Sequence, residues 1–216
     1  MIDAPRLRLA TKKLSGRLSV PVLLHGDLAL TDGLEIVRYA DRVATTGSPL
    51  FPKGKDGQVH RVWWLAREVM TAGRVRSLHR ALRDREALTG YLPFQAPPWL
   101  GPRLSFISEV GVRHILRKYP TADDATTLEA NMAQALDELR ELLGARTFFI
   151  GDAPTAADLA AAGALQFVSP MKARTLPMNP ASARAWTETG LSAAFTDLLA
   201  WRDAFIDHCE RVVYSR

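Results

Sequence analysis

A segment rich in glycine and proline divides the chain into two parts of different character. Residues 44–57 (ATTGSPLFPKGKDG) hold three glycines and two prolines, which interrupt helices and strands. Before this segment, residues 19–30 (SVPVLLHGDLAL) form two short apolar runs around a His-Gly-Asp turn, a pattern typical of two paired strands. Residues 34–43 then predict one helix with an apolar face. After the segment almost the whole chain predicts helix, so we expect an α+β fold whose small sheet is segregated from its helices.

The helices expected after the segment differ in length and regularity. The clearest covers residues 126–143, where large apolar residues recur at spacings of three and four and Gly144 ends the pattern. A long basic helix is expected over residues 59–88, with a bend at Gly73 as one expectation. Further helices are expected over residues 103–119, 156–167 and 191–212, and the proline-rich segments 91–102 and 170–180 are expected to be loops.

Composition restricts the class of protein. The chain has 216 residues, of which 47% are hydrophobic, so it can form a globular core without disulfides or metals. Its single cysteine, Cys209, fits a reducing compartment, and its longest nearly apolar stretch, residues 159–168, is about half as long as a membrane span. We therefore expect a cytoplasmic protein with no membrane partner. We expect no metal, because the five histidines lack metal-ligand spacing with one another or with Cys209.

Charge is distributed unevenly along the chain. Residues 1–120 hold 20 Lys and Arg against 10 Asp and Glu, whereas residues 121–216 hold 8 against 13. The densest run, from Arg61 to Arg85, has seven arginines and only two acids. Such a run can attract an anionic ligand, a nucleic acid or the acidic half of another copy, or it can be a solvated helix face. No nucleic-acid-binding motif accompanies it, so a nucleic-acid partner is not expected.

Two motifs near the N-terminus indicate ligand binding. Val20-Pro21 stands where the first strand begins, and a cis bond there would leave the peptide groups of Val20 facing a ligand, although any edge strand can begin with proline. Asp32-Gly33 opens the helix over residues 34–43, where free N–H groups and the helix dipole suit a carboxylate and Asp32 can pair with an amine. The alternative is an ordinary N-cap formed by Thr31 or Asp32.

A third motif, Gly-Asp-Ala-Pro-Thr-Ala-Ala-Asp at residues 151–158, indicates folding rather than chemistry. Thr155 stands at the N-cap of the next helix, and Asp158 stands three residues later. This spacing predicts a structural capping box, in which each side chain bonds a backbone N–H group of the other residue.

These three motifs, in this order, resemble those of the cytosolic glutathione transferases. VPVLLHGDLALTDGLEIVRYA is similar to the family's cis-proline strand, hairpin and acid-Ser helix start, and GDAPTAAD to a segment of its helical domain. LLAWRD, from residue 198, is similar to its closing helix. The resemblance covers about residues 18–210. It implies a partial thioredoxin-like, glutathione-binding domain over residues 1–45, a linker over 46–57 and an all-helical C-terminal domain over 58–216, with a homodimer as the expected assembly.

The resemblance also implies a function and its residues. It implies a glutathione S-transferase-like protein that conjugates glutathione, as cosubstrate, to an electrophilic small molecule, or that binds it. Val20, Pro21, Asp32 and Gly33 would hold glutathione, although Gly33 lacks the hydroxyl of the family's serine. Trp63, Trp64 and Tyr91 would line the electrophile pocket, or else belong to the ordinary core.

The catalytic residue stays unassigned. In the family a Tyr, Ser or Cys stands at the end of a first strand, and the residues before Pro21 provide no counterpart of that strand. The alternative function is therefore a non-catalytic binding or dimerisation protein that keeps the glutathione-transferase scaffold without the thiol-activating residue.

Overall fold

The computed structural model describes residues 21–92, 101–171 and 178–214. It begins with an antiparallel hairpin, β1 (Leu23–His25) and β2 (Leu28–Leu30), in which Leu23 pairs with Leu30. The turn requires a glycine, because Gly26 has a φ of 56°. Helix α2 (Gly33–Val43) follows, and it carries no buried residue although one of its faces is apolar.

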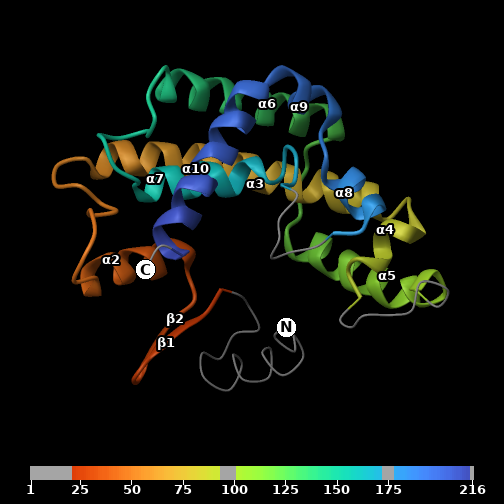
Figure 1. The fold of residues 1–216 in the computed structure, drawn as a ribbon. Helices are drawn as coiled ribbons and strands as arrows, with labels where there is room; N and C mark the ends of the chain where they lie inside the picture. Colours follow the sequence, from red (N-terminus) through yellow and green to blue (C-terminus); the bar gives the residue numbers. More distant parts are fainter. Residues whose placement is uncertain (1–20, 93–100, 172–177, 215–216) are drawn as a thin grey trace.

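The rest of the described chain is helical. Two long helices, α3 (Asp56–Ala81) and α6 (Ala125–Leu143), pack on each other, and α3 also packs on α7 (Ala156–Leu165). Figure 1 shows these helices together, with the hairpin and α2 to one side. The remaining helices are α4 (Arg85–Thr89), α5 (Gly101–Lys118), α8 (Pro180–Trp186), α9 (Thr189–Ala194) and α10 (Thr196–Tyr214). The prediction of an α+β chain with a small sheet and a helical C-terminal region is thus confirmed.

The main core lies where α3, α6 and α7 meet. The regular apolar pattern of α6 is confirmed, because its five expected core residues are all buried: Leu128, Met132, Leu136, Leu139 and Leu143. Gly144, with a φ of 55°, ends the helix as expected. Helix α10 covers α7 from the other side, and Leu198 and Phe195 extend the same cluster.

The long basic helix differs from its prediction in two places. It ends at Ala81, and a separate helix α4 begins after Asp84, whose carboxylate accepts hydrogen bonds from the N–H groups of Glu86 and Ala87. The bend expected at Gly73 is wrong, because α3 continues through that residue. Gly73 is required by packing instead: a Cβ there would lie 2.6 Å from the Cβ of Phe167.

Two further differences concern the last quarter of the chain. Part of the expected loop over residues 170–180 leads into α8, which is capped by Asn179 and has Pro180 in its first turn. The expected helix over residues 191–212 is divided at Phe195 into α9 and α10. No helix in the described ranges is long and apolar enough to cross a membrane.

Candidate functional site

Three of the expected ligand-binding residues lie at the open end of the hairpin. The paired register ends at Leu23 and Leu30, and Pro21 and Asp32 each lie two residues beyond this last pair. Gly33 is the first residue of α2, so all three lie around the start of that helix. Val20, the fourth expected residue, lies outside the described residues. The hairpin thus brings together motifs that are eleven positions apart in the sequence.

Asp32 forms the N-cap of α2. Its Oδ1 accepts hydrogen bonds from the N–H groups of Leu34 at 2.9 Å and Glu35 at 3.1 Å. The ordinary-cap interpretation therefore holds, with Asp32 rather than Thr31 as the capping residue. Within the described part of the chain, Asp32 Oδ2 and the N–H of Gly33 have no hydrogen-bond partner. A side chain at Gly33 would meet no atom within 4 Å, so the space beside this backbone is open.

A cavity of about 320 Å³ adjoins this helix start. Leu30 and Glu35, which flank Asp32 in sequence, line one part of it, and Arg42 and Phe51 line another. The guanidinium of Arg42 lies 5.7 Å from the ring centroid of Tyr39 and makes no ion pair within the described residues. The cavity thus combines apolar walls with the charges of Arg42 and Glu35, and its volume is at the lower end of small-molecule sites.

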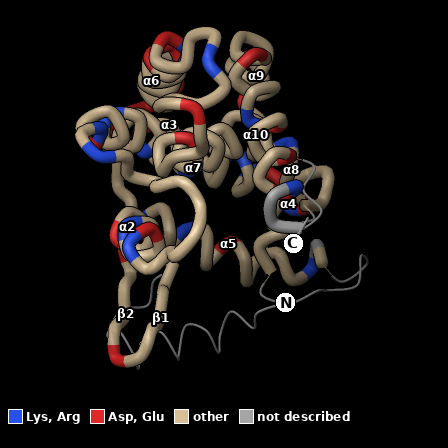
Figure 2. Tube along the Cα trace, turned by 60° about the vertical axis from the view of Figure 1, so that its left-hand side comes forward, with Lys and Arg blue, Asp and Glu red and all other residues tan. Residues whose placement is uncertain are grey.

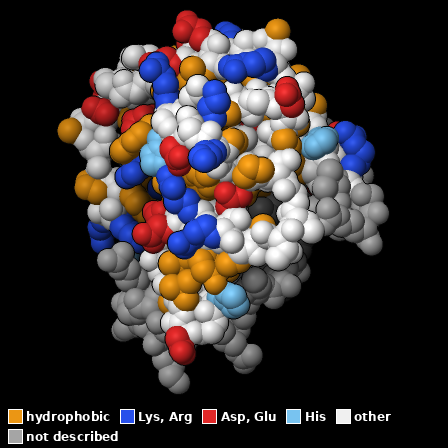
Figure 3. Space-filling model, turned by 90° about the vertical axis from the view of Figure 1, so that its left-hand side faces the viewer, with side chains coloured by type: hydrophobic (Ala, Val, Ile, Leu, Met, Phe, Trp, Pro, Cys, Tyr) orange, Lys and Arg blue, Asp and Glu red, His pale blue; other side chains and the backbone are white. Residues whose placement is uncertain are grey.

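Two side chains of α2 that the sequence did not single out, Asp41 and Arg38, attach this helix to the segment before α3. Asp41 accepts hydrogen bonds from the N–H groups of Leu50 at 2.7 Å and Phe51 at 3.2 Å, which fixes the linker beside α2. Arg38 stacks on Phe51, with 4.5 Å between its guanidinium carbon and the ring centroid, and lies 3.6 Å from Asp56. Figure 3 shows this side of the molecule, where hydrophobic side chains lie beside basic (Lys and Arg) and acidic side chains.

The three aromatic residues expected to line one pocket do not come together. Trp63 packs against the main core, whereas Trp64 is 56% exposed and stacks with Arg67. Tyr91 packs on the clusters that hold Leu78 and Ala81 at the other end of α3, about 20–25 Å from Trp64 along the axis of this unbroken helix. Its hydroxyl accepts a hydrogen bond from the indole N–H of Trp186 at 2.6 Å, and burial raises the pKa of that hydroxyl. The expectation of a shared pocket is corrected accordingly.

The predicted capping box is present. Asp158 is fully buried, and its Oδ2 accepts hydrogen bonds from the N–H of Thr155 at 2.8 Å and from its hydroxyl at 2.6 Å. Its Oδ1 accepts a further bond from the N–H of Phe149 at 2.8 Å. One carboxylate therefore fixes both the start of α7 and the loop before it, which is a structural role.

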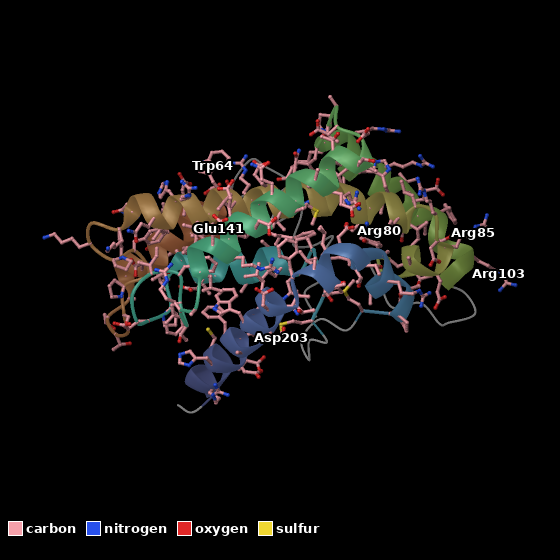
Figure 4. The ribbon with its side chains drawn as sticks, turned by 90° about the horizontal axis from the view of Figure 1, so that it is seen from above. Trp64, Arg80, Arg85, Arg103, Glu141 and Asp203 are labelled. Atoms are coloured by element: carbon pink, nitrogen blue, oxygen red, sulfur yellow. The ribbon has the colours of Figure 1, made fainter. Side chains whose placement is uncertain are left out.

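The basic run does not form one continuous surface. Arg76 makes two hydrogen bonds to the buried carboxylate of Glu188, at 3.0 and 2.8 Å, and Arg80 pairs with the same group at 2.7 Å. Arg61 pairs with Glu138. Figure 4 shows Arg80 well away from Trp64, with Arg85 farther along, and Figure 2 shows basic positions distributed over several elements. Much of the run therefore serves internal pairing.

Cys209 and His208 lie together on α10. Burial raises the pKa of the Cys209 thiol, and the charge of Asp158 raises it further, so the thiolate is disfavoured. The ring of the neighbouring His208 packs edge-on against Phe148. Among the residues the structure describes, no group of three or more His, Cys, Asp or Glu side chains is placed to hold a metal ion.

The helical part of the molecule matches a known family. Residues 122–204 match the family model described as "Glutathione S-transferase, C-terminal domain". Over residues 122–204 the match confirms the resemblance drawn from the sequence, and the similarity is to the C-terminal domain of the glutathione S-transferases. No curated protein and no solved structure gives a significant match to the chain.

Proposed function

We propose that this glutathione S-transferase-like chain binds glutathione at the open end of the hairpin, between Pro21 and the start of α2. The observation that supports the proposal is the Oδ2 of Asp32 and the N–H of Gly33, both free among the described residues, at the start of α2 and beside a cavity lined by Leu30 and Glu35. Val20 and Pro21 would offer backbone groups to the extended tripeptide. The hairpin and α2 would then represent a partial thioredoxin-like unit attached to the helical domain.

The charges of the site suit a tripeptide with one ammonium and two carboxylate groups. The ammonium of the γ-glutamyl end would bind Asp32 Oδ2, and its carboxylate would bind the N–H of Gly33 at the positive end of the α2 dipole. Arg42 would contribute a positive charge for the second carboxylate from across the cavity. An electrophile would enter beside the bound thiol, and the conjugate would leave as product.

The second candidate function is glutathione binding without catalysis. It is favoured by the positions of the Tyr39 phenol and the Cys209 thiol. Tyr39 is hydrogen-bonded to His25 near the hairpin turn, which is opposite to the end that holds Pro21. Cys209 is on α10 and has a raised pKa. Neither group is placed to activate a thiol held at Asp32.

Both candidate functions include the expected assembly and location. We propose a homodimer in the cytoplasm that uses glutathione as cosubstrate or as ligand.

The first experiment separates binding from helix capping. Asp32→Asn keeps an N-cap acceptor but removes the negative charge, so it should weaken glutathione binding by about tenfold while leaving stability almost unchanged. Asp84→Asn is the matched control, because Asp84 caps α4 with the same pair of backbone bonds away from the site. Calorimetric titration with reduced glutathione measures both. Equal binding by parent and Asp32→Asn would contradict the proposed site.

A second measurement separates the two candidates. The parent protein should be retained on glutathione resin and should conjugate a generic aromatic electrophile faster than the uncatalysed reaction. Retention with no turnover above that background would reject the enzyme and leave the binding protein. Failure of both retention and calorimetric binding would reject glutathione as the ligand.

A further inference from the structure

Helix α5 carries an exposed apolar surface that its protein contacts do not explain. Phe106 is 60% exposed, Val110 is 68% exposed and Ile107 is 37% exposed. The opposite side of the helix is buried through Ser105, Ser108 and Val112 and packs on α4 and α3. Figure 1 shows α5 at an edge of the helical part, with α3 and α4 on one side of it. The apolar side chains therefore point away from the protein core.

The second half of the same face is basic. On a helix of 3.6 residues per turn, Phe106, Val110, Arg113 and Arg117 follow one another along a single line. Ile107 begins a parallel line that ends at Lys118. The acid nearest to these lines, Glu109, is paired with Arg113 at 2.8 Å, so Arg117 and Lys118 leave the face with a net positive charge.

Helix α6 offers an internal comparison. It is of similar length, at 19 residues against 18, but none of its large apolar residues is exposed. Its charged residues include Glu129, Asp137 and Glu138, each within reach of an arginine. The run of several exposed apolar residues followed by cations thus distinguishes α5 from α6; on α3 a single exposed apolar side chain, Trp64, lies beside Arg67.

We propose that this face of α5, which we call the α5 ridge (Phe106, Ile107, Val110, Arg113, Arg117 and Lys118), binds an anionic lipid surface. The apolar residues of the ridge line neither the cavity beside α2 nor a second cavity of about 310 Å³ between α3 and α6, which Lys118 borders. A fluid bilayer accommodates an exposed apolar ridge without a complementary shape, and its headgroup phosphates complement the adjacent cations. The helix would lie parallel to the surface, with Phe106 and Val110 inserted below the headgroups. This inference concerns peripheral contact and departs from the expectation of no membrane partner, which rested on the absence of an apolar span.

Vesicle co-sedimentation tests the proposal. The full chain should sediment with vesicles of phosphatidylcholine mixed with phosphatidylglycerol, and much less with phosphatidylcholine alone. High salt should release it, because screening weakens contacts between exposed charges. The double variant Phe106→Ser/Val110→Ser should lower the partition coefficient by at least tenfold, and Arg117→Gln by about fivefold.

Leu159→Ser provides the matched control, because Leu159 is 41% exposed on α7 and outside the ridge. It should bind vesicles as the parent does, and circular dichroism should show the same helix content for all variants. Equal binding to both vesicle types, no binding to either, or unchanged binding by the double variant would each overturn the proposal. If the double variant instead converts a dimer into a monomer and no protein binds vesicles, the ridge contacts a second copy of the chain.

Discussion

The hairpin–helix region and the helical region contain similar apolar patterns but use them differently. Between residues 21 and 44, no side chain is fully buried, although both strands and α2 are rich in leucine and valine. In α7, by contrast, eight residues are buried, including a charged aspartate. An apolar pattern therefore predicts that a helix or strand forms, whereas burial of its apolar side chains requires a second layer of structure that packs over them. The helical region has that layer in α6 and α10, whereas the strands of the hairpin pack mainly on each other.

The largest expected loss of stability concerns the helical region, where side chains are more deeply buried than in the hairpin–helix region. Asp158→Ala should lower the free energy of unfolding by about 4 kcal/mol, because three buried donors lose their only acceptor. Asp32→Ala is the matched change in the hairpin–helix region. It should lower the free energy of unfolding by about 1 kcal/mol, since the N–H groups that bond to Asp32 are exposed to water. Urea denaturation followed by circular dichroism measures both. Similar losses for the two variants would remove the contrast between the regions.

The next effect concerns the buried ion pairs of the helical region. Glu188→Gln should lower stability by about 3 kcal/mol, because Arg80 would lose its carboxylate partner and Arg76 would keep only its pair with the more exposed Glu129. Arg61→Gln, which removes an exposed pair with Glu138, should cost less than about 1 kcal/mol. Thermal denaturation at constant pH compares them, and a larger loss for Arg61→Gln would contradict the assignment of the buried pair as the stronger one.

The same carboxylate predicts a pH dependence. Burial alone would raise the pKa of Glu188, but the hydrogen bonds and charges of Arg76 and Arg80 outweigh burial and lower the pKa below its ordinary value of 4.5. The unfolded chain therefore binds this proton first as the pH falls. The stabilisation should be complete above pH 4.5 and should be lost below it. The stability difference between the parent and Glu188→Gln, followed by denaturation at several pH values, should narrow in the acid range.

A smaller effect tests packing within helices. Gly73→Ala should destabilise the protein by about 2 kcal/mol, because its Cβ would collide with Phe167 and press on Met132 at 3.3 Å. Gly111→Ala, in the exposed face of α5, meets no atom within 4 Å and should stabilise the helix by about 0.5 kcal/mol. Melting temperatures of the two variants should therefore move in opposite directions. A shift in the same direction would show that Gly73 is not held by packing.

The smallest effect belongs to the hairpin. Leu24 is 48% exposed, so Leu24→Ser should change the global stability by no more than about 0.5 kcal/mol. Amide hydrogen exchange should show rapid exchange in β1 and β2 and slow exchange in α3 and α7, because short exposed ladders open locally. Strong protection of the hairpin amides would indicate that a further layer covers this region.

The sequence predicted the elements whose causes are local. The repeat of apolar residues in α6 and the Thr155–Asp158 spacing depend on residues within one helix or one turn, and both were correct. The hairpin was predicted because Gly26 and its neighbours mark a tight turn. The position of Pro21 and Asp32 at one end of the hairpin follows from that hairpin alone.

The features that the sequence missed depend on distant partners. Arg76 was counted within a basic run, because nothing local shows that Glu188 neutralises it from 112 positions away. Gly73 was interpreted as a bend, because its contact with Phe167 exists only after α3 and α7 pack. Trp64 and Tyr91 were grouped by residue type, but the length of α3 separates them. The exposure of the apolar side chains on α5 could not be predicted either, since the apolar pattern of a helix does not show whether another element packs on its apolar face.

The distance in sequence between Arg76 and Glu188 also constrains how the protein is made. Synthesis proceeds from the N-terminus, so Arg76 leaves the ribosome long before its partner has been translated. Before then Arg76 can pair only with the more exposed Glu129 of α6, whereas the Asp158 contacts span at most nine positions and can form as soon as α7 emerges. The Asp158 hydrogen bonds can therefore form early, and the Arg76–Glu188 ion pair forms last. Packing of the helical region is thus completed only after most of the chain has been synthesised.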